Sequence, residues 1–334
     1  MNRNNAIKTI TKYILNWRKN IIQLPSIKIN KFVIKYNSIL YFNITSSRST
    51  NDISNKNREV IISSIINNDI DDKYYLYSRL WRNLKKEIDM FIKRVLEKNN
   101  IIIKSSIHYK CIIKGGRKYK YDFDLVIFDN SNIVTTIFIE FKYNSINIKN
   151  TPQFVSPMHP SNYLSSSYEE YFYYNYLDKI YNLIGLIKPP INEYLKEVSK
   201  SEPNNINMKK CQIKYYAGCS RSSKFTNNND DILFYKKCKE ISKQSIYEFI
   251  KITKLNTIKL QEYLTNTQKN KVYMLFYNKK IYNETNMIDF KIKYIISSPK
   301  KSSYICITKS NYKIKILMRW KNGNGIQFPA FQIS

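Results

Sequence analysis

Three extended runs joined by two short turns constrain the fold of this chain more than any other feature. The runs span 101–113, 118–129 and 133–144, and the turns lie at 115–116 and 130–132. The runs are rich in β-branched and aromatic residues, and parts of them alternate between polar and apolar, as strands do. Short turns bring consecutive strands together as antiparallel neighbours, so the block predicts a β-meander.

Helical patterns flank the meander on both sides. Within 71–100, apolar residues recur every three or four positions and form one stripe. These residues are Leu80, Leu84, Ile88, Phe91 and Val95. After the meander, Ser166 and Glu169 are spaced as a capping box, and Pro189–Pro190 ends the second helical pattern. The sequence therefore predicts a helix, a meander and a second helix, in that order.

The rest of the chain supports a coarser prediction. A segment without acids runs as far as Asp52, and its apolar residues from Ile7 to Ile21 have helical spacing. It could serve as a phosphate-contacting arm, an organelle-targeting peptide or a docking helix. Beyond the second helix we expect, in chain order, a loop at 202–208, a strand at 212–218, a loop at 220–231, a helix at 240–264, a strand at 271–278, and a hairpin of strands 312–320 and 326–334 around a turn at 322–325.

The charge of the chain indicates its class of partner. The 334 residues include 56 Lys and Arg against 25 Asp and Glu, which gives a net charge of +31. An AT-rich genome favours lysine codons, but Asp and Glu codons also contain A and T, so base composition alone does not explain the imbalance. We expect a polyanionic partner, nucleic acid rather than a membrane. No apolar run approaches the roughly 18 residues that a membrane-spanning helix requires.

Cysteine, histidine and glycine usage excludes several classes of protein. The five cysteines form no C-x-x-C pair, and His108 and His159 are the two histidines, which argues against zinc. Unpaired cysteines favour a reducing, intracellular setting, in cytoplasm or nucleus. The base-composition bias fits a virus, a mobile element or an AT-rich microbe. The six glycines form no phosphate-binding loop and no G-x-S-x-G occurs, so a dinucleotide enzyme, an NTPase motor and a serine hydrolase are unsupported.

Charged residues interrupt the apolar pattern at the end of the third run. Strand alternation places Glu140 and Lys142 on the same face, and Asp122 and Asp124 share a face of the preceding run. Depending on register, one of these two aspartates lies opposite or diagonal to Glu140. Neighbouring carboxylates repel unless a cation lies between them, and oxygen ligands suit Mg²⁺ or Mn²⁺. With Lys142 placed to orient or activate a water, the pattern indicates metal-assisted hydrolysis of a phosphodiester; an edge-strand ion pair is the alternative.

These motifs resemble the PD-(D/E)XK superfamily of restriction-endonuclease-like nucleases. The matched positions are Asp124 within DFDLVIF, Glu140 and Lys142 within IEFK, and Glu87 in place of the acid that many members carry on the first helix. A solvated Glu87 on the helix flank is the alternative. Phe123 stands where the motif has proline, and Asp122 is a rival metal ligand. The resemblance covers roughly 73–187.

The resemblance implies both a fold and a domain division. The fold is α/β, with a restriction-endonuclease-like core in which a central mixed sheet, in the order α-β-β-β-α-β, is flanked by helices. Residues 1–70 would form a basic N-terminal extension and 71–334 a nuclease-like domain. In that domain, 210–334 would complete the sheet and the DNA-binding surface, with a C-terminal β-hairpin.

The implied activity is that of a Mg²⁺-dependent DNA endonuclease. Asp124 and Glu140 would hold Mg²⁺ or Mn²⁺, and Lys142 would assist the attacking water. Double-stranded DNA is the expected substrate, and nucleases of this kind often form homodimers to cut both strands. Basic residues at the first turn and in the C-terminal hairpin are the expected DNA contacts: Lys114, Arg117, Lys118, Arg319 and Lys321. The alternative is a catalytically inactive, basic nucleic-acid-binding protein on the same scaffold.

Overall fold

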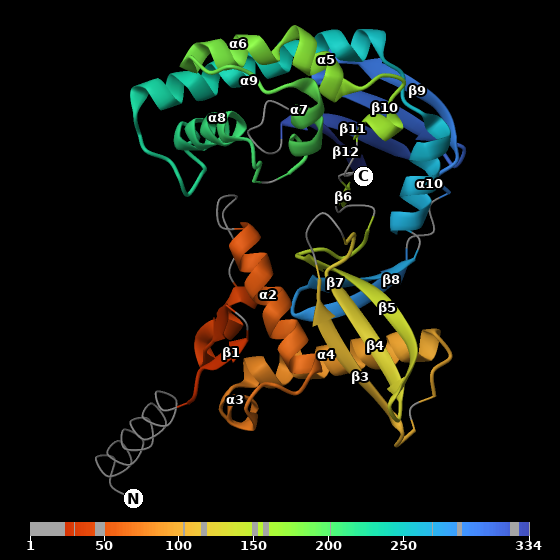
Figure 1. The fold of residues 1–334 in the computed structure, drawn as a ribbon. Helices are drawn as coiled ribbons and strands as arrows, with labels where there is room; N and C mark the ends of the chain where they lie inside the picture. The colour runs from red at the N-terminus through yellow and green to blue at the C-terminus, as the bar shows by residue number, and fades with distance from the viewer. Residues whose placement is uncertain are drawn as a thin grey trace, which may run out of the picture. The chain divides into compact units, whose positions relative to one another are not determined.

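Two compact units make up the chain in the computed structural model (Figure 1). Unit 1 comprises Met1–Gly115, Tyr121–Asn147 and Lys271–Thr285, and unit 2 comprises Gly116–Lys120, Ile148–Asn270 and Asn286–Ser334. The structure describes residues 24–29, 31–43, 51–102, 104–114, 119–148, 153–155, 160–200, 202–268, 270–285, 289–320 and 327–333. None of the helices in these ranges is long and apolar enough to cross a membrane.

Unit 1 is built on a mixed five-stranded sheet. The strands lie in the order β3-β4-β5-β7-β8, with β5 and β7 parallel and the other neighbours antiparallel. The expected α/β class with a mixed sheet flanked by helices is therefore confirmed. The elements of unit 1 are β1 (Ile27–Ile29), β2 (Phe32–Ile34), η1 (Tyr36–Phe42), α2 (Asn51–Ile66), α3 (Asp72–Tyr77), α4 (Arg79–Lys98), β3 (Ile107–Ile113), β4 (Phe123–Asp129), β5 (Asn132–Tyr143), β7 (Lys271–Tyr277) and β8 (Lys280–Thr285).

The predicted β-meander is confirmed as strands β3, β4 and β5. Asn130, at φ +53°, makes the tight turn between β4 and β5, where Asn is among the residues that tolerate a left-handed backbone. The β4–β5 register shifts between Ile127 and Phe128 and then runs regularly to the pair Phe123–Ile139. This register decides which carboxylates meet at the far end of the hairpin.

Helix α4 forms because its apolar stripe has a core to bury. The predicted residues Leu84, Ile88, Phe91 and Val95 are buried among the side chains of the central strands. The expected single helix at 71–100 is divided at Ser78, which has an extended backbone. The Ser78 hydroxyl accepts a hydrogen bond from the backbone N–H of Trp81 and so caps α4.

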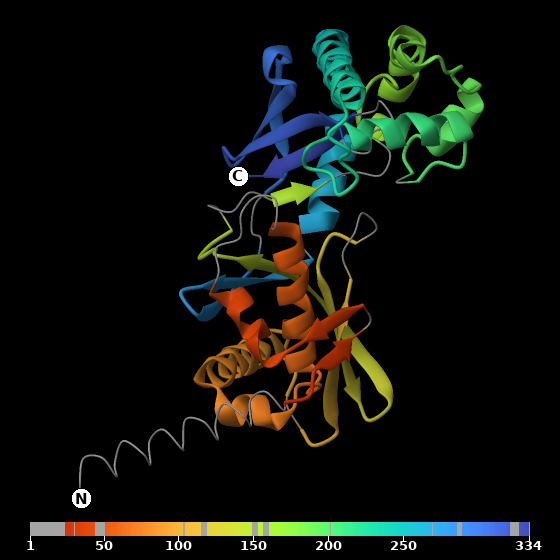
Figure 2. The same ribbon diagram turned by 90° about the vertical axis from the view of Figure 1, so that its left-hand side faces the viewer.

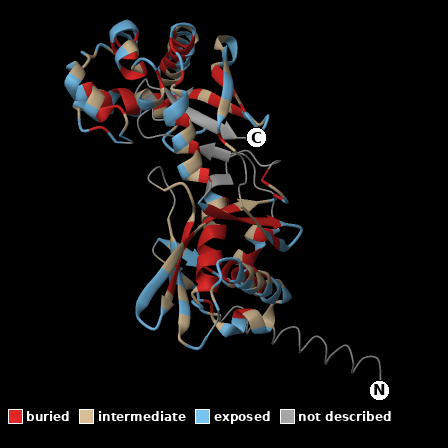
Figure 3. Cartoon of the chain, turned by 90° about the vertical axis from the view of Figure 1, so that its right-hand side faces the viewer, coloured by how far each residue is buried: buried red, intermediate tan, exposed pale blue. Residues whose placement is uncertain are grey.

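Helix α2 belongs to the core of unit 1, so the expected extension over 1–70 is wrong at its C-terminal end. The last turns of α2, from Val60 to Ile66, are almost entirely buried and lie alongside β3 (Figures 2 and 3). The expected helix at 7–21 lies outside the described residues. Polar residues alternating with the isoleucines of α2 obscure its apolar face in the sequence, and its contribution to the core is therefore a finding of the structure.

Unit 2 combines helices with a second, antiparallel sheet. The sheet order is β6-β12-β11-β10-β9, and α9 contacts β9 and β11. Its elements are β6 (Gln153–Val155), η2 (Pro160–Tyr163), α5 (Tyr168–Asn175), α6 (Leu177–Tyr181), η3 (Asn182–Ile184), α7 (Ile191–Glu197), α8 (Ile206–Ala217), α9 (Asn229–Ile252), α10 (Thr257–Gln268), β9 (Ile292–Ser298), η4 (Pro299–Lys301), β10 (Ser303–Thr308), β11 (Lys313–Trp320) and β12 (Gln327–Ile333).

Several expectations for this part of the chain are wrong. The strand expected at 212–218 is the second half of α8, because Met208, Cys211 and Tyr215 recur at helical spacing and are buried. The Asn205 side chain caps this helix by accepting from two backbone N–H groups. Similarly, Ser167 rather than Ser166 caps α5.

The boundaries of two further predictions also change. The helix expected at 240–264 is divided into α9 and α10, and α9 begins inside the loop expected at 220–231. The predicted C-terminal hairpin forms as β11 and β12, but it completes the sheet of unit 2. From the segment 210–334, β7 and β8 are the strands that join the sheet of unit 1.

Candidate carboxylate–lysine site

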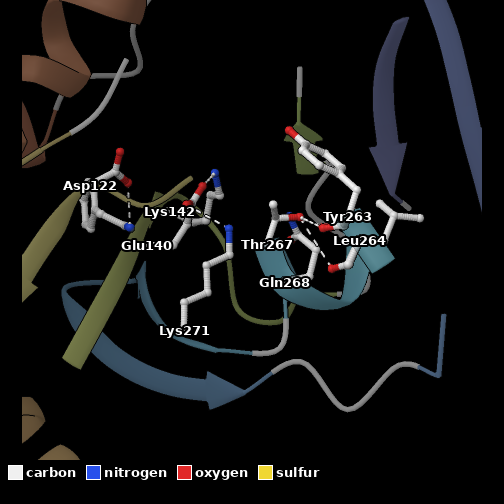
Figure 4. A network of polar contacts seen from close by, with 9 residues as sticks. Asp122, Glu140, Lys142, Tyr263, Leu264, Thr267, Gln268 and Lys271 are labelled. Atoms are coloured by element: carbon white, nitrogen blue, oxygen red, sulfur yellow. Dashed lines mark hydrogen bonds and ion pairs between the residues drawn. The ribbon is translucent and has the colours of Figure 1, made fainter. Parts of the chain in front are cut away.

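Charged side chains from β5, from the first residue of β7 and from the residue directly before β4 meet at one end of the central sheet of unit 1 (Figure 4). Glu140 and Lys142 project from the same face of β5, as alternation requires, and form an ion pair. Lys271, the first residue of the parallel strand β7, places its Nζ 3.0 Å from the other carboxylate oxygen of Glu140. The Lys271 side chain is buried, with 5% of the residue exposed. Each oxygen of Glu140 therefore contacts a lysine.

Asp122 lies directly before β4 and adjoins this group. Its backbone N–H donates to the carbonyl of Ile139 at 2.9 Å, and its carboxylate accepts from the backbone N–H of Phe141 at 2.8 Å. Extending the register by one residue from the pair Phe123–Ile139 sets Asp122 opposite Glu140. Of the two aspartates that the sequence left open, Asp122 is therefore opposite Glu140 and Asp124 is diagonal to it.

Glu59 of α2 brings a third carboxylate that the sequence did not predict. It is almost completely buried and forms an ion pair with Lys56 one turn earlier, at 2.6 Å. The charge of Glu140 acts on Glu59 electrostatically, as does that of Lys142. We call Glu59, Asp122, Glu140, Lys142 and Lys271 the carboxylate–lysine cluster.

Burial and mutual repulsion set the proton affinities of the acids in the cluster. Burial, followed by the charges of Glu140 and Glu59, raises the pKa of Asp122 to about 7. Burial also raises the pKa of Glu59, although Lys56 opposes the effect. For Glu140, burial alone would raise the pKa, but Lys142 and Lys271 outweigh it and hold the pKa below its ordinary value. At neutral pH Glu140 is therefore ionised and Asp122 is partly protonated.

The two lysines respond to burial in opposite directions. For Lys142, burial would lower the pKa, but Glu140 and Asp122 outweigh it and the pKa is raised. For Lys271, burial dominates over the attraction of Glu140, and the pKa is lowered. Lys142 is thus a firmly held positive charge beside Asp122 and Glu140.

Asp124, the expected metal ligand, lies diagonal to Glu140 and forms an ion pair with a different lysine. The register pairs it with Phe138, and its Oδ2 lies 2.9 Å from Nζ of Lys114. Its Oδ1 is buried without a hydrogen-bond partner among the described residues. Lys114, expected to contact DNA, therefore neutralises Asp124 in this structure.

Glu87 has a structural contact on the other face of the sheet. Helix α4 packs against the face that carries Ile139 and Phe141, whereas Glu140 projects from the opposite face of β5. The Glu87 carboxylate accepts from the backbone N–H of Ile281 at 3.0 Å and so attaches α4 to the edge strand β8. The structure does not bring Glu87 to Glu140.

The other expected DNA contacts fall where the structure gives no side chains. Arg117, Lys118 and Lys321 lie outside the described residues, and for Arg319 the backbone of β11 is described without the side chain.

The carboxylates of the cluster suit a hard divalent cation that takes its remaining ligands from water and substrate. No group of three or more Asp, Glu, His or Cys in the described ranges is arranged to enclose a metal ion. Mg²⁺, however, commonly uses one or two protein carboxylates and completes its shell with waters and substrate phosphates. Asp122 and Glu140 supply two such carboxylates; burial, and then the charge of Glu140, raises the pKa of Asp122.

Comparison with known proteins gives no further guide to the class of this protein. No family model, no curated protein and no solved structure matches the chain.

Proposed function

We propose that the protein is a Mg²⁺-dependent DNA endonuclease, with the carboxylate–lysine cluster as its active site. The observation that carries the proposal is the convergence of Asp122, Glu140 and Lys142 at the end of one hairpin. This is the arrangement that the resemblance to PD-(D/E)XK nucleases implies, with Asp122 in the role expected of Asp124. Glu59 of α2 takes the place expected of Glu87, since it is the helix acid on which the charge of Glu140 acts.

Each residue of the cluster has a chemical role in this proposal. Asp122 and Glu140 would hold the metal, which when bound polarises the scissile phosphodiester. Lys142, whose ammonium is stabilised by two acids, orients the attacking water and offsets charge on the phosphate. Lys271 holds Glu140 in place through its second oxygen. The net charge of +31 supports a polyanionic substrate.

One observation favours the alternative of an inactive nucleic-acid binder. Both oxygens of Glu140 contact lysines, so the cluster can also be understood as an internally neutralised network that stabilises the hairpin. A metal would have to compete with Lys142 or Lys271 for the Glu140 carboxylate.

Nicking of supercoiled plasmid by two matched variants tests the proposal. Asp122→Asn and Asp124→Asn make the same chemical change at two positions that are two residues apart, one directly before β4 and one within it. In Mg²⁺ we expect Asp122→Asn to lose at least about 100-fold in nicking rate, because a metal ligand is removed. Asp124→Asn should retain activity within about tenfold, since Asp124 pairs with Lys114 and not with the cluster. Lys142→Ala should match Asp122→Asn.

The possible results separate the hypotheses. Equal nicking by the wild type and Lys142→Ala would eliminate the mechanism. Loss of nicking in Asp124→Asn, with full nicking in Asp122→Asn, would show that the metal binds at Asp124, the position expected from the sequence. Absence of nicking by the wild type in Mg²⁺ and Mn²⁺ across plasmid, linear and branched DNA would favour the inactive binder.

A further inference from the structure

The sheet of unit 2 has one face in the core and one face outside it. Tyr304, Cys306, Ile314 and Ile316 are fully buried and belong to the core of unit 2. Ile305 and Ile307 of β10, and Lys313 and Lys315 of β11, alternate with them, project from the opposite face and are half-buried or exposed. Those residues are absent from the set that packs on the described core, so the outward face is distinct from it.

Register arranges this outward face into two rows across β9, β10 and β11. The first row is Tyr294, Ile307 and Lys313, and the second is Ile296, Ile305 and Lys315. Tyr294 is 49% exposed and Ile296 is 48% exposed, although both are large apolar or aromatic residues. Each row therefore runs from an exposed apolar side chain on the edge strand, through a half-buried isoleucine, to a lysine.

The charge of the surrounding chain is one-sided. From residue 290 to residue 334 there are nine Lys and Arg and no Asp or Glu. A sheet face with lysines and no acids in its own chain segment repels cationic partners and attracts a polyanion. Lys313 and Lys315 lie about 6.8 Å apart along β11, so they can contact different phosphates.

We propose that the outward face of β9, β10 and β11 binds single-stranded nucleic acid. Bases stack on Tyr294 and lie against the isoleucines, while Lys313 and Lys315 contact the phosphates. A duplex offers phosphates but keeps its bases paired, so it would leave the exposed apolar residues without a partner. This binding surface goes beyond the proposed function, because it requires neither a metal nor the carboxylate–lysine cluster.

Fluorescence anisotropy with a labelled 20-nucleotide oligothymidine tests the inference in EDTA, where no hydrolysis through a divalent metal takes place. We expect Tyr294→Ala to weaken binding by about tenfold, because stacking on an aromatic residue contributes roughly 1–3 kcal/mol per base. The matched control is Tyr174→Ala on α5, which removes a tyrosine that is 65% exposed elsewhere in unit 2. The control should bind as the wild type does.

A charge series tests the role of the lysines. Lys313→Gln combined with Lys315→Gln should reduce the slope of log affinity against log salt by about 1.4, from about 0.7 for each phosphate contact on a single strand. The control is Lys209→Gln combined with Lys210→Gln, which makes the same charge change at two exposed positions of α8. A slope that falls equally in both double variants would overturn the assignment to the sheet.

Two further binding measurements decide whether the ligand is single-stranded nucleic acid, a duplex or a membrane surface. The wild type should bind the oligothymidine more tightly than a 20-base-pair duplex, and Tyr294→Ala should reduce this preference. Equal affinity for both forms, or equal binding by Tyr294→Ala and the wild type, would overturn the single-strand proposal. Binding to vesicles that contain phosphatidylserine, with no binding to the oligonucleotide, would overturn it in favour of a membrane surface. None of these outcomes depends on whether plasmid is nicked.

Discussion

Asp122 shows how one residue records the electrostatics of its surroundings. Its pKa is raised to about 7 by burial and by two neighbouring acids, so the folded protein holds this proton more tightly than the unfolded chain does. Because the pKa is raised, the contribution of Asp122 to the free energy of unfolding is largest at low pH. This contribution is lost as the pH rises from the pKa in the unfolded chain, about 4, through about 7. Above about pH 7 it no longer changes with pH.

Replacing Asp122 with Asn should therefore stabilise the metal-free protein in a pH-dependent manner. Asn imitates the protonated acid, so the two proteins should have similar stability near pH 4. By pH 8 the variant should be more stable, by on the order of 1–3 kcal/mol. Urea unfolding in EDTA between pH 4 and pH 8 measures the difference. A difference that does not change with pH would show that Asp122 ionises normally.

Lys271 should be the residue on which Glu140 depends for its position. Lys271→Met keeps the volume but removes the ammonium, and a buried carboxylate that loses one of its partners is strongly destabilised. We expect a loss of about 3 kcal/mol in the free energy of unfolding. Lys280→Met, at an exposed position of β8, is the control and should change stability by less than about 0.5 kcal/mol.

A double-mutant cycle isolates the contact between Lys271 and Glu140. If the contact stabilises the fold, Lys271→Met should lower the free energy of unfolding by less in a Glu140→Gln background than in the wild type. In that background no buried charge is left without its partner. Equal costs in both backgrounds would assign the effect to packing of the lysine stem instead.

The residues of the candidate site were predictable from sequence to different degrees. Strand alternation suffices to place Glu140 and Lys142 on one face. Whether Asp122 or Asp124 lies opposite Glu140 depends on the β4–β5 register. That register shifts at the bulge between Ile127 and Phe128, and the periodicity of the sequence does not predict the shift. Glu59 and Lys271 come from elements 81 and 131 residues away from Glu140 in the sequence, and contacts over such separations follow from the assembled fold.

At the scale of elements, hydrophobic periodicity predicted secondary structure correctly where one face of the element is apolar. It was ambiguous where polar and apolar side chains are interspersed. The stripe of α4 predicts its buried residues correctly, because a single face is apolar. The segment QIKYYAG alternates like a strand over a few residues, but three residues buried at helical spacing and the Asn205 cap place it in a helix. Short windows cannot distinguish the two periods when tyrosines and lysines are interspersed.

The junction of α8 and α9 depends on the absence of a side chain at Gly218. A Cβ at this position would lie 1.9 Å from the carbonyl oxygen of Asp231 and 2.8 Å from Cβ of Tyr235. Because the first neighbour is backbone, α9 would have to move. We expect Gly218→Ala to lower the free energy of unfolding of unit 2 by about 2–3 kcal/mol, the cost of overpacking.

Gly185→Ala provides the contrast for this prediction. Gly185 has φ +64° but no neighbour within 4 Å of the added Cβ, so the substitution tests backbone conformation alone. We expect Gly185→Ala to lower the free energy of unfolding by about 1 kcal/mol. Thermal unfolding of both variants, followed by circular dichroism, gives the comparison. A larger loss in Gly185→Ala than in Gly218→Ala would contradict the close approach of the two helices.

At the scale of the whole molecule, positive charge is dispersed while the acids of interest are concentrated. The excess of 31 positive charges extends over both units, and the segment from 290 to 334 has no acid at all. The carboxylate–lysine cluster, by contrast, is confined to one end of the sheet of unit 1 and to Glu59 of α2. Affinity for nucleic acid and hydrolysis should therefore respond to different substitutions.

Glu140→Gln should abolish cleavage while leaving the affinity for duplex DNA within about threefold of the wild type. Many phosphate contacts contribute to binding, each adding about 0.9 to the slope of log affinity against log salt. That slope should remain unchanged in the variant, because Glu140 lies among lysines and is not a phosphate contact. Filter binding over 50 to 200 mM salt on a 30-base-pair duplex measures both quantities. Glu262→Gln, which makes the same charge change at an exposed position of α10, controls for net charge. A collapse of affinity in Glu140→Gln alone would mean that the cluster itself binds the DNA, and the separation of binding from hydrolysis would then be wrong.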